Sequence, residues 1–310
     1  MRVLIVSSFK PSLEGNIAPF VKEQVEAISQ QGVECSYYLV RGKGILGYLR
    51  ELPSLRKWIR EIEPDVVHAH FGLCGLLANL QRKVPVVTTY HGSDINVPSI
   101  RRFSKIAIRL SKHNIFVSKK LAEIAKPKKN NYSIIPCGIN LKDYPIVDKL
   151  EARQEMGLDP DKKYVLFAGA FDNPVKNPQL AKDAVSLIPD VELLELKGYS
   201  RHQVALLMNA VDCFLMTSHT EGSPQVIKEA MACGCPSVSV DVGDVKEMID
   251  GVKFCYISSR DAGNIAQKIR TTTNFCSKSN GKDIIKEQGI TNEEIAQRII
   301  RDYNLSTKKI

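Results

Sequence analysis

The sequence predicts two α/β domains, each built on an open, doubly wound parallel sheet. Short apolar runs rich in Val, Ile, Leu and Phe alternate along the chain with segments of helical periodicity. This pattern is typical of parallel strands joined by crossover helices. The chain has 310 residues and 44% hydrophobic content, which is more than one hydrophobic core usually holds. We therefore expect two domains of about 150 residues each.

The expected strands form two series. In the first half of the chain the apolar runs occupy residues 3–8, 35–40, 65–70, 84–90, 114–118 and 132–136. In the second half they occupy residues 164–169, 192–196, 213–218, 236–240 and 254–258. Each series is long enough for one doubly wound sheet. The segment from Asn292 has helical spacing through Ile295, Ile299 and Ile300, so a helix is expected there.

The break between the domains is expected near residues 140–149, where Gly138, Pro145 and charged residues separate the two series. This gives domains of residues 1–145 and 146–310, with the last helix a candidate to pack back on the first domain. Ligands of such sheets bind at the carboxyl ends of the strands. An active site is therefore expected in a cleft where the two domains face each other.

The formal net charge of +9 is unevenly distributed. Residues 1–145 hold 22 Lys+Arg and 11 Asp+Glu, whereas residues 146–310 hold 21 and 23. The densest basic stretch, residues 101–131, contains Glu123 as its only acid. A nucleic acid, an anionic membrane surface, an anionic substrate or an ordinary solvated face would each explain this excess.

The sequence carries no sign of a membrane span or a zinc site. Its apolar runs fall short of the roughly 20 residues that cross a bilayer, and the first residues lack a signal peptide's cleavage region. We therefore expect a soluble, cytoplasmic protein. The eight cysteines lack the paired C-x2-C spacing of a zinc site and are expected to be reduced structural thiols.

The segment after the expected strand 213–218 contains residues that are typical of a helix start. Gly222 permits an unusual turn, Ser223 is a good N-cap, and Pro224 suits the first helical position. Gly234 is expected to end the helix. The sequence therefore predicts a short helix with Ser223 as its N-cap and Pro224 as its first residue.

The start of this helix is a candidate phosphate site with an acid on either side. At about Gln225 and Val226 the first turn offers backbone N–H groups and the positive end of the helix dipole. Glu221 lies just before the helix, and Glu229 lies roughly two turns into it. A carboxylate accepts two hydrogen bonds and can orient a vicinal diol. A nucleotide sugar has two sugar rings on either side of its diphosphate, so one acid for each ring would suit it. The alternative is that both acids are ordinary surface charges, as most glutamates are.

This segment resembles the E-x7-E motif of the family 4 retaining glycosyltransferases, whose GT-B fold has two Rossmann-like domains facing across a cleft. The matching residues are Ser218, Glu221, Gly222, Glu229, Ala230, Met231, Ala232, Gly234 and Pro236. Further matches, at Pro64, Val86, Ile115, Ile134 and Tyr164, extend the resemblance over nearly the whole chain. It implies transfer of a sugar from a nucleotide-sugar donor with retention of configuration, and we expect the donor to be a UDP- or GDP-sugar. It also implies that neither a metal nor another cofactor is used.

The resemblance further implies roles for individual residues. Glu221 would contact the hydroxyls of the donor sugar, Lys176 would pair with the diphosphate, and His91 would line the cleft near the transferred sugar; these three are the catalytic candidates. Glu229 would hold the ribose. The donor-binding candidates are Gly15, Gly169, Gly222, Ser223, Pro224, Gln225, Val226 and Glu229. A plain loop histidine and a solvated lysine are the alternatives for His91 and Lys176.

Two departures from the family pattern bear on phosphate binding. Many relatives have an arginine after the glycine that ends the first strand of the second domain, whereas this chain has Ala170 after Gly169. Relatives often have two adjacent glycines after the first strand, whereas here only Gly15 is present. The helix start near Gln225, or a basic residue of the first domain, would have to replace the missing charge. A noncatalytic relative therefore stays an alternative.

The second domain is also expected to be short. Between the strands at 192–196 and 213–218 only one helix fits. A segment that frames the nucleobase in longer relatives is therefore expected to be trimmed, so the base is not inferred from the resemblance.

In this fold the first domain generally faces the acceptor. Because that domain holds the basic excess, we expect an anionic acceptor at a membrane surface, such as a lipid-linked diphosphate sugar or a lipopolysaccharide core. A soluble saccharide acceptor is the alternative. The expected contact residues are Arg101, Arg102, Lys105 and Arg109, together with the basic stretch from Arg50. The protein would then be peripheral at the inner face of the membrane.

Three other function classes fit the sequence less well. A dinucleotide-dependent oxidoreductase needs a G-x-G-x-x-G turn after a strand, and neither SSFKPSLEGN nor GAFDNPVKN provides one. A sugar-nucleotide epimerase shares the two-domain architecture, but the two acids in their EAMA setting favour transfer. An RNA-binding protein would carry a recognisable RNA motif, so no nucleic-acid partner is expected.

Overall fold

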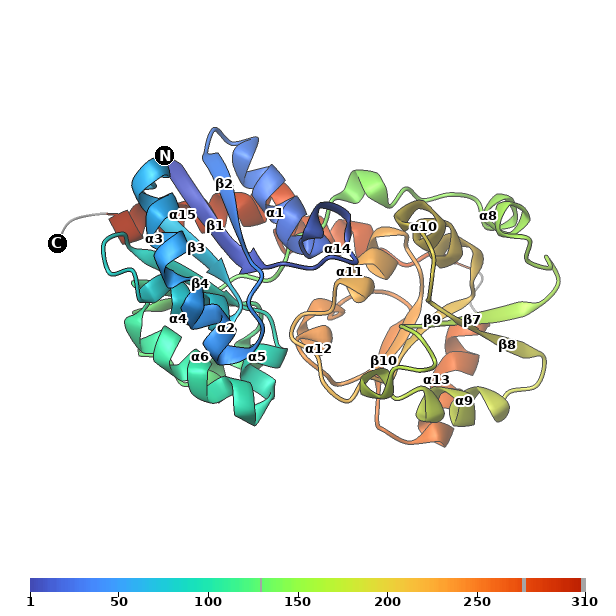
Figure 1. The fold of residues 1–310 in the computed structure, drawn as a ribbon. Helices are drawn as coiled ribbons and strands as arrows, with labels where there is room; N and C mark the ends of the chain where they lie inside the picture. The colour runs from blue at the N-terminus through green and yellow to red at the C-terminus, as the bar shows by residue number, and fades with distance from the viewer. Residues whose placement is uncertain (129, 275–276, 308–310) are drawn as a thin grey trace. The chain divides into compact units, whose positions relative to one another are not determined.

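The computed structural model describes residues 1–128, 130–274 and 277–307. The chain divides into two compact units, each an α/β unit with a parallel sheet (Figure 1). The first unit contains Met1–Gly138 and the C-terminal segment from Asn292, and the second contains Ile139–Thr291. This division falls a few residues before the boundary expected from the sequence.

In the described part of the chain, the first unit contains a six-stranded parallel sheet in the order β2-β1-β3-β4-β5-β6. The strands are β1 (Arg2–Ser8), β2 (Glu34–Val40), β3 (Val66–His70), β4 (Val86–Tyr90), β5 (His113–Phe116) and β6 (Tyr132–Ile134). Each apolar run expected in the first half of the chain overlaps one of these strands, so that prediction is confirmed. The strand order changes direction between β1 and β3, which is the feature of a doubly wound sheet.

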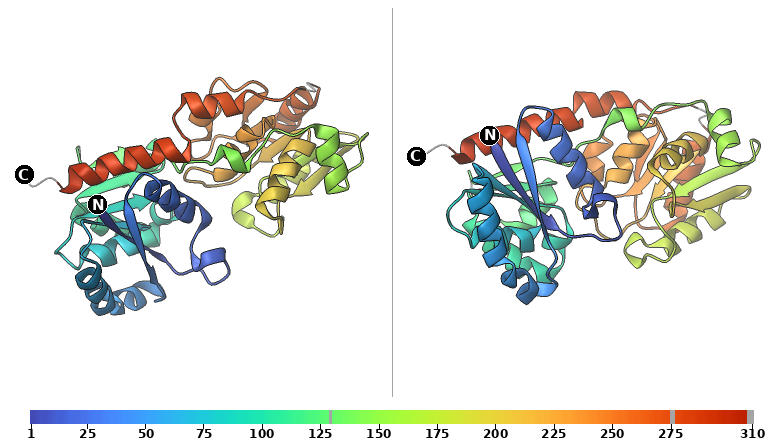
Figure 2. Two further views of the ribbon diagram at one scale, coloured as in Figure 1. Left: turned by 90° about the horizontal axis from the view of Figure 1, so that it is seen from above. Right: turned by 45° about the horizontal axis from the view of Figure 1, so that its top comes forward.

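Helices cover both faces of this first sheet (Figures 1 and 2). They are α1 (Pro19–Ser29), α2 (Gly44–Arg50), α3 (Leu52–Ile62), α4 (Gly72–Asn79), α5 (Ser93–Asn96), α6 (Pro98–Leu110), α7 (Lys119–Ala125) and α15 (Asn292–Thr307), with a short 3-10 turn η1 (Glu14–Asn16). α1 and α15 pack side by side, while α3 and α4 lie on the opposite face of the sheet. The predicted helix from Asn292 is confirmed.

Successive side chains of a strand point to opposite faces of the sheet, so each strand contacts the helices on both sides. One face of β1 and β3 carries aliphatic side chains that pack with α2, α3 and α4: Leu4, Val6, Val67 and Ala69. The other face carries His68, whose Nδ1 lies 2.6 Å from the hydroxyl of the fully buried Tyr303 in α15. This contact joins the C-terminal helix to the first sheet.

Within the described residues, the second unit contains a five-stranded parallel sheet in the order β11-β10-β9-β7-β8. The strands are β7 (Lys163–Phe167), β8 (Val191–Glu195), β9 (Cys213–Met216), β10 (Ser237–Val240) and β11 (Cys255–Ser258). They overlap the five apolar runs expected in this half, so the prediction of a second parallel sheet is confirmed.

The helices of the second unit again form two layers (Figure 1). They are α8 (Lys149–Met156), α9 (Pro178–Ser186), α10 (Arg201–Ala210), α11 (Gln225–Ala232), α12 (Val245–Met248), α13 (Ala262–Thr273) and α14 (Gly281–Glu287), with 3-10 turns η2 (Leu141–Asp143) and η3 (Pro174–Lys176). α10 is the helix predicted between β8 and β9. Its N-cap is Ser200, whose side chain forms a capping box with that of Gln203.

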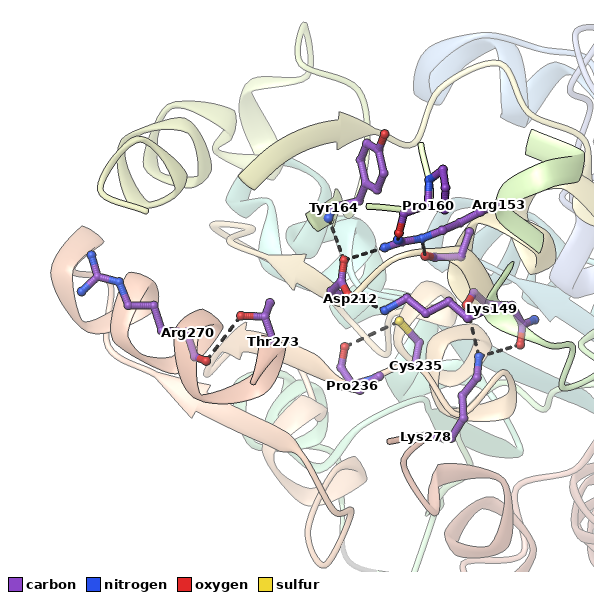
Figure 3. Close-up of polar contacts among 12 residues, drawn as sticks. Lys149, Arg153, Pro160, Tyr164, Asp212, Cys235, Pro236, Arg270, Thr273 and Lys278 are labelled. Carbon is purple, nitrogen blue, oxygen red and sulfur yellow. Dashed lines mark hydrogen bonds and ion pairs between the residues drawn. The ribbon is translucent and has the colours of Figure 1, made fainter. Parts of the chain in front are cut away.

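A buried polar network at the amino-terminal edge of the second sheet joins α8, β7 and β9 (Figure 3). The Asp212 carboxylate accepts hydrogen bonds from Lys149 Nζ, from Arg153 Nη2 at 2.9 Å and from the Tyr164 backbone N–H at 2.7 Å. Arg153 is only 4% exposed. Because these groups lie at the edge opposite the strand ends where ligands bind, the network serves the fold rather than a site.

The sequence predicts reduced cysteines and no membrane-spanning segment. Within the described residues the cysteines are free thiols: Cys35, Cys74, Cys137, Cys213, Cys233, Cys235 and Cys255. Cys276 lies outside the described residues. None of the helices in the described ranges is both long enough and apolar enough to cross a membrane.

Candidate active site

Loops at the carboxyl edge of the second sheet hold most of the predicted donor-binding residues. Gly169 lies shortly after β7, and Lys176 ends η3 in the same loop. Glu221 and Gly222 lie in the turn between β9 and α11. Because β7 and β9 are adjacent and parallel, the loops that follow them meet at one edge of the sheet.

Lys176 and Glu221 form an ion pair at this edge. Lys176 Nζ lies 2.7 Å from Glu221 Oε1, and the two side chains are 23% and 16% exposed. A Cβ atom on Gly169 would come within 2.9 Å of Lys176 Cγ, so the glycine leaves room for the lysine stem. Thr217 Oγ1 donates to the Lys176 carbonyl at 3.0 Å and ties the loop to the end of β9. The structure thus brings Glu221 to two predicted residues of a loop about 45 positions earlier in the chain.

Helix α11 begins one residue later than the sequence predicts. Its N-cap is Pro224, and its first residues are Gln225 and Val226. The prediction of Ser223 as the N-cap is wrong, because the Ser223 hydroxyl lies 3.0 Å from Lys228 Nζ and accepts a hydrogen bond from it instead. No role was assigned to Lys228 from the sequence. Its inward position in an otherwise apolar stretch of the helix is the signal that could have identified it.

The rest of α11 follows the sequence prediction. Gly234 has a left-handed φ of 64°, and its N–H donates to the Met231 carbonyl at 3.0 Å, so the helix ends before it as expected. Glu229 is partly buried and lies four residues after Gln225. Residues four apart share one face of a helix. Glu229 therefore lies one turn below the first residue of α11, on the same face.

Arg260 is a further residue that the sequence did not reveal. It follows β11, and its guanidinium donates to the carbonyls of Thr217 at 3.3 Å, Ser218 at 2.8 Å and His219 at 3.3 Å. These bonds hold the segment that leads to Glu221. The contact joins residues about 40 positions apart, and no local pattern in the sequence announces it.

His91 lies in the first unit, directly after β4, among aromatic rings. Its Nε2 lies 3.0 Å from His70 Nδ1, and its Nδ1 lies 3.7 Å from Cys137 Sγ. The rings of Phe20 and Phe71 approach it with centroid distances of 4.9 and 4.8 Å. Burial, with the nearby histidines, lowers the pKa of His70 well below its ordinary value. The His91 imidazole is thus held in one orientation beside a neutral partner.

Asp94 fixes the backbone that carries His91. Its carboxylate accepts hydrogen bonds from the N–H groups of His91 at 3.1 Å and Gly92 at 2.9 Å. Burial raises the pKa of Asp94 to about 6, although these N–H donors act in the opposite direction. The motif VVTTYHGSD contains this aspartate, but its contact with the turn was not predicted from the sequence.

Gly15 and the predicted basic surface also belong to the first unit. Gly15 has a left-handed φ of 67° in the turn after β1 and lines a cavity with residues of α1 and β2. Arg101 is partly buried, and its guanidinium donates to carbonyl groups of α5. The other three predicted contact residues, Arg102, Lys105 and Arg109, are exposed on α6.

Metal-ligating side chains do not gather in the residues that the structure describes: no group of three or more His, Cys, Asp or Glu is placed to hold an ion. His68 illustrates the structural use of such residues. Its Nε2 lies 2.8 Å from Thr89 Oγ1 and its Nδ1 contacts Tyr303. Burial lowers the pKa of His68 to about 3, so it is a neutral core histidine.

Two protein-family models match the chain. The model described as Glycosyltransferase Family 4 matches residues 17–143, and the model described as Glycosyl transferases group 1 matches residues 164–274. The second match contains the loops after β7 and β9 and the whole of α11. The matched ranges together cover most of both units.

A sequence relative agrees with these models. The chain is 29% identical over 241 residues to the teichuronic acid biosynthesis glycosyltransferase TuaC of Bacillus subtilis, a match that covers 68% of this chain and 61% of that protein. The chain thus spans less than two thirds of the length of this curated relative.

Solved structures show the same fold. Sucrose-phosphate synthase from Thermosynechococcus elongatus matches with a TM-score of 0.83 at 16% identity over 98% of both chains. HepE from Anabaena in complex with UDP matches with a TM-score of 0.77 at 17% identity, over 98% of this chain and all of the other. The predicted fold class, GT-B with two Rossmann-like units, is confirmed. By the two family models, which match residues 17–143 and 164–274, the chain belongs to the family 4 and group 1 glycosyltransferases.

Proposed function

We propose that this chain is a retaining glycosyltransferase that moves a sugar from a nucleotide-sugar donor to a saccharide or lipid-linked acceptor. The observation that carries the proposal is the ion pair of Lys176 and Glu221. Glu221 lies a few residues before the first residue of α11. TuaC, which is named for teichuronic acid biosynthesis, supports a role in cell-surface polysaccharide or lipopolysaccharide biosynthesis. HepE, which has been solved with UDP and with UDP-glucose, supports a UDP- or GDP-sugar donor.

The donor diphosphate is proposed to bind between Lys176 and the first turn of α11. The N–H groups of Gln225 and Val226, the helix dipole and the Lys176 ammonium would share its charge. On binding, the diphosphate would take the place of Glu221 beside Lys176. The Glu221 carboxylate could then accept hydrogen bonds from the donor sugar. Glu229 would hold the ribose.

The transfer step is proposed to occur on one face of the sugar. The bond between the anomeric carbon and the diphosphate oxygen breaks, the bond to the acceptor oxygen forms on the same side, and the leaving phosphate takes the acceptor's proton. Lys176 and the N–H groups would stabilise the charge that develops on the diphosphate. His91 would line the site of the transferred sugar. The proposal includes neither a protein base nor a metal or other cofactor.

The acceptor is proposed to lie at an anionic membrane surface that α6 contacts. Arg102, Lys105 and Arg109 are exposed on α6, and Ile106 beside them is 42% exposed. Basic side chains with an apolar neighbour suit the inner face of a membrane. In flotation assays the chain should bind anionic and not neutral vesicles, and the triple glutamine variant of the three basic residues should lose this binding. Equal binding to both vesicle types would count against the surface.

The donor is tested by thermal unfolding with a panel of UDP-, GDP-, ADP- and TDP-sugars. One class should stabilise the protein, because a ligand at 100 times its dissociation constant adds about 2.7 kcal/mol. With that donor and a saccharide acceptor, NMR of the product should show the anomeric configuration of the donor. A panel in which nothing stabilises the chain would refute donor binding, and an inverted product would refute retention.

A further inference from the structure

A lysine lies fully buried beneath the turn that precedes α11. Lys228 is 0% exposed. Its Nζ lies 3.0 Å from Ser223 Oγ and 2.8 Å from Gln225 Oε1. Side chains of a helix lean toward its amino end, and this one reaches back past the first turn. The ammonium therefore holds the two residues on either side of Pro224.

The position of this charge has an electrostatic cost that packing alone does not require. A cation near the amino end of a helix opposes the helix dipole. Taking an ammonium out of water also costs several kcal/mol unless opposite charge repays it. An apolar side chain would fill the same volume without either cost. The lysine is thus better explained by its polar contacts at this turn than by packing.

The loop after β10 lies against the same turn and brings a carboxylate. A Cβ atom on Gly243 would come within 2.8 Å of the Gly222 carbonyl oxygen and 3.3 Å of Glu221 Cβ, so the two loops are in contact. The next residue, Asp244, is partly buried, and its Oδ1 is shielded from solvent without a hydrogen-bond partner within the described part of the protein. Burial raises the pKa of Asp244, while Lys228 and the Ser223 hydroxyl act to lower it. Asp244 therefore lies close enough to share the charge of Lys228.

We propose that Lys228 is a positioning residue for the donor diphosphate: it fixes Ser223 and Gln225 and places a positive charge behind the turn that receives the phosphates. Asp244 moderates that charge when no donor is bound. The inference rests on the proposed function. In the loop after β7, Ala170 is uncharged and Lys176 is the residue that pairs with Glu221. Lys228 supplies a second positive charge, in addition to Lys176, from within the helix.

The test compares nucleoside diphosphates with monophosphates in the full chain. UDP, UMP, GDP and GMP are titrated at pH 8 into the wild type, Lys228→Met and the control Lys246→Met, which removes an exposed lysine from α12. Lys228→Met should weaken diphosphate binding at least tenfold and monophosphate binding less than threefold. Lys246→Met should change neither by more than twofold. Equal losses for both kinds of nucleotide, or no loss, would overturn the proposal.

Asp244→Asn provides a second test, in which the preference for diphosphate is expected to change in the opposite direction. This test does not depend on whether Lys228→Met folds. This nearly isosteric change removes the carboxylate that moderates Lys228, so the preference for diphosphate over monophosphate should rise by two- to fivefold. An unchanged or lower preference would overturn the proposal. If none of the nucleotides bound the folded wild type, the proposed function itself would be refuted. That failure is distinct from a failure confined to the variants.

Discussion

Replacing Asp94 with asparagine should change how the stability of the protein depends on pH. Burial raises the pKa of Asp94 to about 6 in the folded chain, against an ordinary value of 3.8. The folded state therefore binds this proton more tightly than the unfolded state does. The resulting stabilisation is complete below about pH 4 and is lost as the pH rises through about 6. A shift of about two pKa units corresponds to about 3 kcal/mol.

Urea unfolding of the wild type and of Asp94→Asn between pH 4.5 and 8 measures this effect. Because the other carboxylates are shared, their contributions cancel in the difference between the two proteins. The stability of the wild type relative to the variant should fall by about 2 kcal/mol across this range, most of it below pH 7, because the full effect of about 3 kcal/mol is reached only below about pH 4. Asp250→Asn, at an exposed site, should track the wild type. Parallel profiles for the wild type and Asp94→Asn would show that burial does not raise the pKa of Asp94 in the folded protein.

Two predictions concern the fold. Asp212→Ala should lower the free energy of unfolding by about 3 to 5 kcal/mol in chemical denaturation, because it leaves the buried Arg153 guanidinium without its carboxylate; a loss below about 1 kcal/mol would contradict this. Gly75→Ala should lower the unfolding free energy by about 1 to 3 kcal/mol, since the new methyl group would meet Thr88 Cγ2 at 2.5 Å. The matched change Gly263→Ala, in α13 with only one contact at 3.3 Å, should leave the melting temperature unchanged or raise it. Equal effects of the two glycine changes would argue against the packing explanation.

The inner strands were the most predictable, because they are buried on both faces. A parallel strand such as β3, in which every residue is buried, reads as a short continuous apolar run, and polar segments mark its ends. The doubly wound class follows from the alternation of such runs with helices. The boundary of α11 was less predictable, because the local preference of Ser223 for the N-cap position lost to a hydrogen bond from Lys228.

The candidate site was predictable only where one short segment carries it. Glu221, Glu229 and the first turn of α11 lie within a few residues of each other, and the family resemblance marked Lys176 and Gly169 by their place after a strand. Arg260 reaches the site from another strand's loop through long-range contacts. Such tertiary contacts leave no periodicity or spacing in the sequence, so they had to be seen in the structure.

The most direct test of a donor site at Glu221 and Glu229 is the rate at which nucleoside diphosphate is released from the donor that the panel identifies. The account predicts that Glu221→Gln and Glu229→Gln each lower this rate at least tenfold, equivalent to about 1.4 kcal/mol of transition-state stabilisation. Their melting temperatures should stay near that of the wild type. Glu287→Gln, at an exposed position of α14, should react at the wild-type rate. Near-normal rates in both site variants would contradict the account.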